Sequence, residues 1–150
     1  MGVAALNRAR MSANESSAVA SLKTINMAQT RYNVGCGRGA YASSLLILGR
    51  PPNAVNSSGG YLDAPLSTAE VVEHNGYRIT VQMGAGGTPG QQVDCHGNGT
   101  MTAYRATAVP LAINATGSRS FSTNQNGGVW QLPGETAPTE PFGPPAELYR

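Results

Sequence analysis

The stretch ARMSANESSAVASLKTINMAQTRY, residues 9–32, predicts one long helix close to the start of the chain. When the residues are placed at about 100° per position, its larger apolar side chains fall on one narrow stripe, which we expect to face the core. This core face consists of Met11, Ala18, Leu22, Ile25 and Tyr32. Gln29 lies within the stripe and Glu15 lies at its border, so we expect the better packing between Ala18 and Ile25.

The opposite side of this helix carries mostly small residues. They are Ala9, Ala13, Ser16, Ala20, Thr24 and Met27. Small side chains allow another helix to approach closely, although Ala and Ser are equally compatible with an ordinary exposed helix surface. We expect the helix to end near Asn33, because Gly35, Gly37 and Gly39 remove helix propensity and can supply a left-handed cap.

Length and composition indicate a single domain, residues 1–150, with few charges. Only 12% of the residues are charged and the formal net charge is +2, so uncharged polar groups must supply solubility. The basic residues are scattered and do not alternate with aromatic ones, which disfavours nucleic-acid binding. No run of about eighteen or more apolar residues occurs, so no membrane span is expected within these residues. Residues 1–11 do not have the pattern of a signal peptide.

The chain has two cysteines, Cys36 and Cys95, and we expect them to form a disulfide. Both lie in Gly-rich polar segments, VGCGRG and VDCHGNG, and not in the apolar runs where inert buried thiols usually lie. An oxidising compartment would favour the bond, and two free thiols in a cytosolic protein are the alternative. In the chain-entropy model, closing a loop of roughly 60 residues stabilises the fold by about 4 kcal/mol.

Residues 34–73 have an irregular pattern, in which we expect no regular sheet. YASSLLILG, residues 41–49, predicts one or two helical turns, with Leu45, Leu46 and Leu48 anchoring the segment on the core. RPPNAVNSSGGYLDAPLS, residues 50–67, has the Pro, Asn, Ser and Gly content of an ordered surface loop.

Residues 74–132 predict an antiparallel sheet. One strand is NGYRITVQMGA, in which one face collects Tyr77, Ile79, Val81 and Met83. A second strand is MTAYRATAVPLAI, residues 101–113, which Pro110 weakens. SRSFSTNQNGGVWQL, residues 118–132, contains a hairpin signal at Asn126-Gly127. The tail, residues 133–150, has too many prolines for a helix or a central strand, and we expect it to be extended or partly disordered.

These elements predict an α+β fold, in which the long N-terminal helix packs on an antiparallel sheet of three or four strands. The helix ends in the pattern Thr24, Ile25, Asn26, Ala28 and Tyr32, after a run of Arg, Ala, Asn, Glu and small residues. In this stretch the chain resembles the type IV pilin family, which includes the pseudopilins of type II secretion. Weaker matches are YASSLLILG between helix and sheet, GYRITV as first strand and GSRSFSTNQNGGVWQ as closing hairpin. The resemblance covers residues 4–132 and leaves the tail unmatched.

The resemblance implies a structural subunit, without catalytic residues, that polymerises through its N-terminal helix. Its partners would be other pilin subunits and the envelope assembly machinery, at the bacterial cell surface or in the periplasm. The helix side with Ala9, Ala13, Ser16, Ala20 and Met27 would then be the assembly face.

In the family, a leader, a cleavage site and an apolar membrane segment of about 20 residues precede this part of the helix. None of the three lies within residues 1–150, so leader processing, N-terminal methylation and membrane anchoring are expectations that the resemblance alone implies. Arg8 and Arg10 would lie near the membrane surface before assembly. Without the apolar segment, we expect this domain to be soluble and monomeric.

The run Asp94, Cys95 and His96 invites a metal or catalytic interpretation, which we do not favour. A zinc site needs about four ligands, usually from spaced pairs, and a disulfide would remove Cys95 as a ligand. We expect no metal, no cofactor and no enzymatic activity, because no set of acid, base and nucleophile can be assembled.

Two other function classes remain open at this point. The first is a free secreted binding module for a glycan or a surface ligand, which would use the 84–100 loop and Trp130. A lone Trp in a hairpin beside Phe121 is, however, more often a packing residue. The second is a small enzyme, for which the sequence offers no catalytic set.

Overall fold

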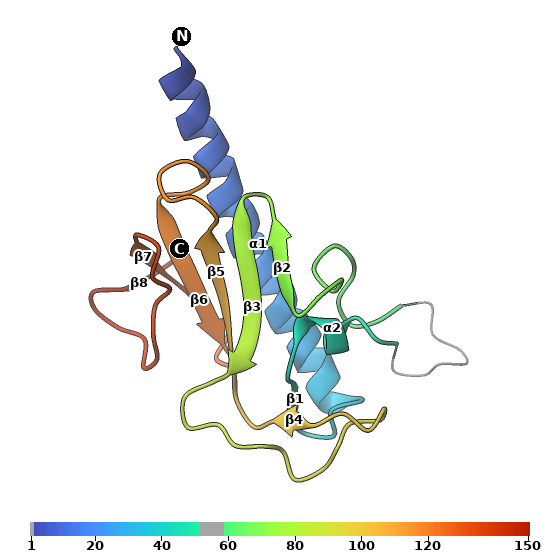
Figure 1. Ribbon diagram of the computed structural model, residues 1–150. Helices are drawn as coiled ribbons and strands as arrows, with labels where there is room; N and C mark the ends of the chain where they lie inside the picture. Colours follow the sequence, from blue (N-terminus) through green and yellow to red (C-terminus); the bar gives the residue numbers. More distant parts are fainter. Residues whose placement is uncertain (1, 52–58) are drawn as a thin grey trace.

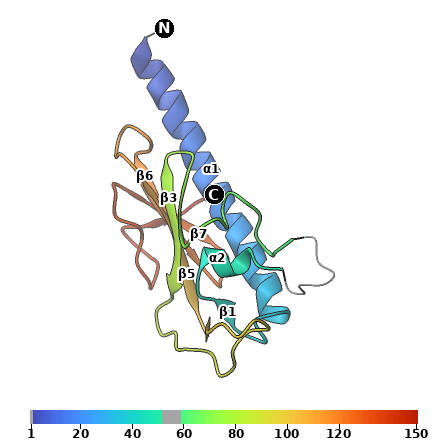
Figure 2. The same ribbon diagram turned by 45° about the vertical axis from the view of Figure 1, so that its right-hand side comes forward.

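The computed structural model describes residues 2–51 and 59–150 and has an α+β fold. Helix α1 (Val3–Val34) packs along one face of a six-stranded antiparallel sheet (Figure 1). The predicted long helix and antiparallel sheet are therefore confirmed, but the expected number of three or four strands is wrong. The first turns of α1 extend beyond the ends of the strands (Figures 1 and 2).

The strand order of the large sheet is β2-β3-β5-β6-β7-β8. The strands are β2 (Val71–His74), β3 (Tyr77–Met83), β5 (Tyr104–Pro110), β6 (Arg119–Asn124), β7 (Val129–Pro133) and β8 (Glu147–Leu148). A second sheet of two strands pairs β1 (Tyr41–Ala42) with β4 (Thr100–Met101), and a short helix, α2 (Leu45–Leu48), follows β1. In the hairpin between β6 and β7, the predicted turn contains Gly127 at a φ of 89°.

The expectation of no regular sheet within residues 34–73 is wrong, because β1 and the start of β2 lie there. Strand β2 forms a hairpin with β3 through Asn75 and Gly76, whose φ angles are 47° and 80°. An Asn-Gly pair with two positive φ angles is the usual two-residue turn of a hairpin. Of the predicted surface loop, residues 52–58 lie outside the described part of the chain.

The core lies between α1 and the sheet face that it covers. Leu22 and Ile25 of the helix are fully buried, and so are Ala106 and Ala108 of β5. Two alanines at successive inward positions leave room for the helix backbone to approach the sheet.

One predicted core contact, that of Leu46, is wrong, whereas the predicted face of β3 is present. Tyr77, Ile79 and Val81 on this face are buried, and Met83, at the end of the strand, is 40% exposed. Leu46 is 39% exposed, because the single turn of α2 buries Leu45 and Leu48 and leaves Leu46 on its outer side.

The two polar residues of the core face, Glu15 and Gln29, are buried and fully partnered. Gln29 accepts from the backbone N–H of Ala42 (2.8 Å) and donates to the carbonyl of the same residue (3.0 Å), so it replaces a missing strand partner of β1. Glu15 accepts from the Ser118 hydroxyl (2.8 Å) and forms an ion pair with Arg119 (3.2 Å). Both side chains therefore attach the helix to specific backbone positions instead of weakening its packing.

From Gly134 to Glu140, the proline-rich tail crosses the sheet face opposite to α1, and it then adds the edge strand β8 next to β7. Three alternate residues of β6 hold it there. Ser120 donates to the carbonyl of Gly134 (2.8 Å), Ser122 donates to that of Pro138 (2.7 Å), and Asn124 donates to the Glu140 carboxylate (2.8 Å). Beyond β8, the ring of Tyr149 packs against Phe121 on the core side of the sheet. The tail consists mainly of bends and turns around the two-residue strand β8, and its packing covers the outer face of β6.

Candidate functional site

The side of α1 away from the sheet is the first candidate surface. All five residues of the expected assembly face are exposed, and so is Thr24. Leu6, which is 53% exposed, continues the same side toward the N-terminus. We call the resulting line the outer stripe; it consists of Leu6, Ala9, Ala13, Ser16, Ala20, Thr24 and Met27. No element among residues 2–51 and 59–150 covers it.

The predicted core face lies against the sheet for most of its length. Ala18, Leu22, Ile25 and Tyr32 are buried, whereas Met11 is only half-buried. Met11 lies in the N-terminal half of α1. The first turns of this half extend past the strands (Figures 1 and 2). The helix is therefore covered on one side toward its C-terminal end and open on every side toward its N-terminal end.

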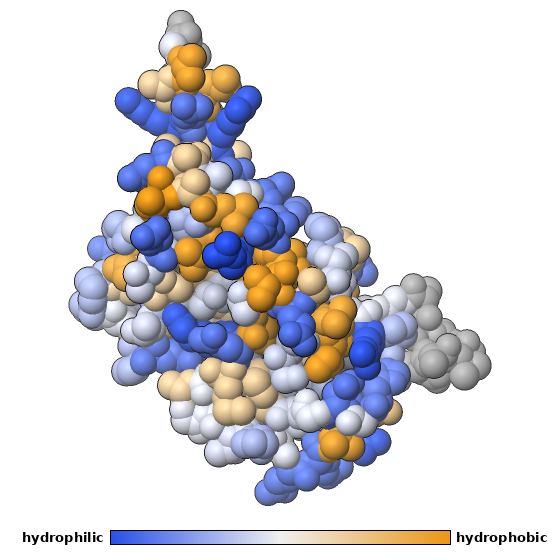
Figure 3. Space-filling view, viewed as in Figure 1, coloured by the Kyte–Doolittle hydropathy of each residue, from blue (hydrophilic) through white to orange (hydrophobic). Residues whose placement is uncertain are grey.

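The open end of the helix carries hydrophobic residues between hydrophilic ones (Figure 3). Val3 is 75% exposed, and a shallow hollow there is lined by Val3, Ala5, Leu6 and Ala9. The open end of the helix thus exposes apolar side chains next to the outer stripe.

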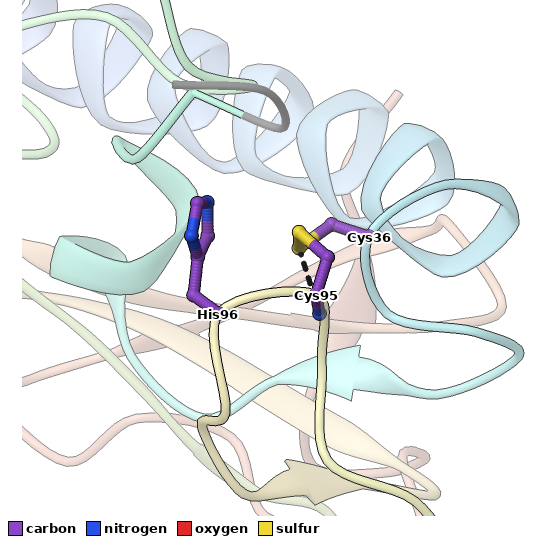
Figure 4. Close-up of side chains that lie close together, drawn as sticks. All are labelled: Cys36, Cys95 and His96. Atoms are coloured by element: carbon purple, nitrogen blue, oxygen red, sulfur yellow. Dashed lines mark hydrogen bonds between the residues drawn. A yellow bond between two sulfur atoms is a disulfide. The ribbon is translucent and has the colours of Figure 1, made fainter. Parts of the chain in front are cut away.

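The second candidate surface surrounds the disulfide. Cys36, just after α1, is bonded to Cys95 in the 84–100 loop, so the predicted disulfide is present (Figure 4). Gly35 ends the helix at a φ of −112°, so the cap is not left-handed; the positive φ angles follow at Arg38 and Gly39. The imidazole of His96 lies beside the disulfide, within 4.8 Å of both sulfurs. Because disulfide sulfurs are not thiolates, this cluster has no thiolate ligand for a metal.

Asp94, the residue before Cys95, organises the loop from within. Its carboxylate is 2% exposed and accepts hydrogen bonds from the Tyr32 hydroxyl (2.7 Å) and from the backbone N–H groups of His96 (2.8 Å) and Asn98 (2.8 Å). Burial acts to raise the pKa of Asp94, but these hydrogen bonds outweigh burial and hold the pKa below its ordinary value. Asp94 therefore stays ionised at neutral pH and organises the loop through these hydrogen bonds.

Three buried tyrosines also act as structural donors. Burial raises the pKa of Tyr32, Tyr77 and Tyr104 well above the ordinary value, and the Asp94 carboxylate raises that of Tyr32 further. Tyr77 donates to the carbonyl of Arg119 (2.6 Å), and Tyr104 donates to the side chain of Asn26 (2.6 Å). All three hydroxyls stay protonated at neutral pH, and each donates a hydrogen bond within the fold.

The third candidate surface is a hollow of about 560 Å³ on the outer side of the sheet. Its lining includes Ala85, Asn124, Asn126, Trp130, Glu140 and Phe142. Trp130 and the 84–100 loop thus both line the hollow, but Ala85 is the one residue of that loop in its lining. Glu140 and Phe142 come from the tail, for which the sequence pattern indicated no site. The only signal for them in the sequence is an aromatic residue and a carboxylate within a proline-rich segment.

Comparisons with models of known protein families, with curated proteins and with solved structures found no match. Within residues 2–51 and 59–150, no helix combines the length and the apolar character that crossing a bilayer requires.

Proposed function

We propose that this chain is a structural subunit of a type IV pilus-like or pseudopilus filament, which polymerises with other subunits through α1. The observation that carries the proposal is the outer stripe, which stays exposed along a helix that extends beyond its own sheet. A helix whose second side is uncovered in one subunit can bury that side only against another chain.

The geometry of the outer stripe suits packing between helices. Its residues follow one another in steps of three and four, an average of about 3.5, which is the spacing of a helix-packing seam. The stripe contains no charged residue from Leu6 to Met27, a length of roughly 30 Å. Arg10 and Lys23 lie outside it, where they would remain solvated at the border of a contact. Its small residues allow close approach of a second helix.

Two further features support the proposal. One long helix against an antiparallel sheet is the arrangement that the resemblance to pilins implies, with the sheet and loops forming the outer surface of the filament. The disulfide between Cys36 and Cys95 is favoured in an oxidising compartment, in agreement with a place at the cell surface or in the periplasm. The envelope assembly machinery would be the second partner.

The assembly face is tested by changing Ala13 and Ala20 to Gln in the protein produced in its native cells. Both side chains are exposed, so the thermal unfolding midpoint should change little, while filaments should be lost. Ala69→Gln is the matched control, because Ala69 is also exposed but lies outside α1, just before β2. Normal filaments with the double variant would show that the assembly face is misassigned.

The function itself is tested by the mass of the N-terminal peptide of the protein isolated from those cells. The proposal expects an apolar N-terminal segment of about 20 residues before Val3, with a methylated first residue. A mature N-terminus near Gly2 would contradict the filament function. It would favour a free secreted binding module, for which the hollow beside Trp130 is the supporting observation.

A further inference from the structure

We propose that the hollow beside Trp130 is a binding site for a neutral saccharide. The inference does not depend on filament assembly, because the hollow lies on the sheet face opposite to α1. Its volume of about 560 Å³ is within the range of small-molecule sites, about 300 to 1,000 Å³.

The hollow is built by three separate segments that Glu140 holds together. One carboxylate oxygen of Glu140 accepts from the backbone N–H of Ala85 (2.9 Å), and the other accepts from the Asn124 side chain (2.8 Å). The tail, the start of the 84–100 loop and the end of β6 are thus connected through one side chain. Such a connection fixes the wall of the hollow before any ligand arrives.

Aromatic rings supply the apolar part of the site. Trp130 and Phe142 stack with their ring centroids 5.8 Å apart and their planes 25° from parallel. Stacking on Phe142 restrains the indole, and both residues line the hollow. An aromatic surface of this kind packs against the apolar C–H faces of a sugar ring.

Amide groups supply hydrogen bonding at the rim. Within the described residues, the Asn126 side chain makes no hydrogen bond, and the amide nitrogen of Gln125 makes none either. Asn and Gln side chains offer both donors and acceptors. A ligand with several hydroxyl groups, which also donate and accept, matches such a set.

An aromatic pair beside a carboxylate could also attract an organic cation. The charge at the site distinguishes this alternative from a neutral saccharide. Both oxygens of Glu140 already accept hydrogen bonds. The Arg105 guanidinium donates to the carbonyl of Pro138 and interacts electrostatically with Glu140. The negative charge is therefore offset by a neighbouring cation, and the site favours a neutral ligand.

The emission of Trp130 reports directly on the site, because Trp130 is the single tryptophan of the chain. The purified protein is titrated with maltotriose, cellotriose, chitotriose and lactose as neutral probes, and with choline as the cationic probe. We expect a saturable change of emission with at least one of the neutral saccharides. Saturation by choline alone would identify a cation site, and no saturable change with any probe would refute ligand binding; either result overturns the proposal.

Two substitutions show whether the response arises in the hollow. Asn126→Ala removes a rim amide and should weaken saccharide binding by about threefold to tenfold. Asn7→Ala, at an exposed position of α1, is the matched control and should leave binding unchanged. Equal weakening by both variants, or by neither, would show that the saccharide binds elsewhere. The N-terminal mass of the native protein remains a separate test of the filament function.

Discussion

The hydroxyl of Tyr32, in the last turn of α1, donates a hydrogen bond to the carboxylate of Asp94 at 2.7 Å. Both side chains are buried, and the residue after Asp94 is the cysteine that bonds to Cys36. The end of the helix and the 84–100 loop are thus joined by this hydrogen bond to a charged group, by the disulfide, and by a backbone hydrogen bond from the N–H of Cys95 to the carbonyl of Cys36 (3.0 Å). Four predictions follow from this junction and from the contacts of the helix with the sheet.

Tyr32→Phe should lower the free energy of unfolding by about 1.5 to 3 kcal/mol, the usual range for a buried hydrogen bond to a charged group. The ring is retained, so core packing should not change. Urea unfolding at neutral pH measures the effect. The control is Tyr41→Phe, for whose hydroxyl the structure shows no hydrogen bond within the described residues. Equal losses in the two variants would mean that the bond to Asp94 contributes nothing specific.

Stability should fall in acid partly through Asp94. The pKa of Asp94 is lowered in the folded protein, because its hydrogen bonds outweigh the effect of burial. Its stabilising contribution is therefore fully present above the unfolded pKa of about 3.9, and it is lost as the pH falls through the lower pKa of the folded state. Asp94→Asn cannot titrate. The difference in unfolding free energy between the natural protein and this variant should therefore be larger at neutral pH than in acid below the unfolded pKa of about 3.9. A difference that stays constant over this range would contradict the assignment.

Glu15→Gln should lower the free energy of unfolding by about 1 to 2 kcal/mol, because it removes the charge that Arg119 and Ser118 contact at the helix–sheet interface. Glu73→Gln is the matched control. The pair of Glu73 with Arg78 is exposed and 3.9 Å long, so its loss should change stability by less than about 0.5 kcal/mol. Chemical denaturation of both variants under the same conditions tests the contrast.

Replacing Cys36 and Cys95 together by Ser should lower the free energy of unfolding by about 4 kcal/mol in the chain-entropy model. The bonded residues are 59 positions apart in the sequence, so the bond restricts a long loop in the unfolded chain. A reducing agent should destabilise the natural protein by a similar amount and leave the double variant unchanged. A variant as stable as the natural protein would show that the junction does not depend on the covalent bond.

The sequence predicted the helix and most of the sheet because their patterns are local. The spacing of Ala18, Leu22 and Ile25 identifies the buried side of α1 even when the sheet that covers it is unknown. The alternation of apolar and polar residues in β3 likewise identifies the buried face of this strand. Strands β1, β4 and β8 escaped prediction because they contain two residues each, too few for a period to be recognised. Strand β2 was also missed, because its four residues are VVEH, which contain only one full alternation.

The polar residues of the core were misjudged for a related reason. Gln29 interrupts the apolar stripe, and the sequence alone indicated weaker packing there. Its partner, the backbone of Ala42, lies 13 residues away in a two-residue strand. A buried amide is favourable only when its partners are in place, and long-range partners are not visible in a local pattern.

By itself, the sequence determined the buried side of the helix, the hairpin turn at Asn126-Gly127 and the class of fold, because periodicity and turn chemistry act over a few residues. Tertiary structure alone decided where the tail lies, since the hydroxyls of Ser120 and Ser122 find acceptors more than ten residues away. It also decided the hollow beside Trp130, whose walls come from segments far apart in the chain. Side chains make a site only when the fold brings them within contact distance, and that distance depends on the packing of the whole chain.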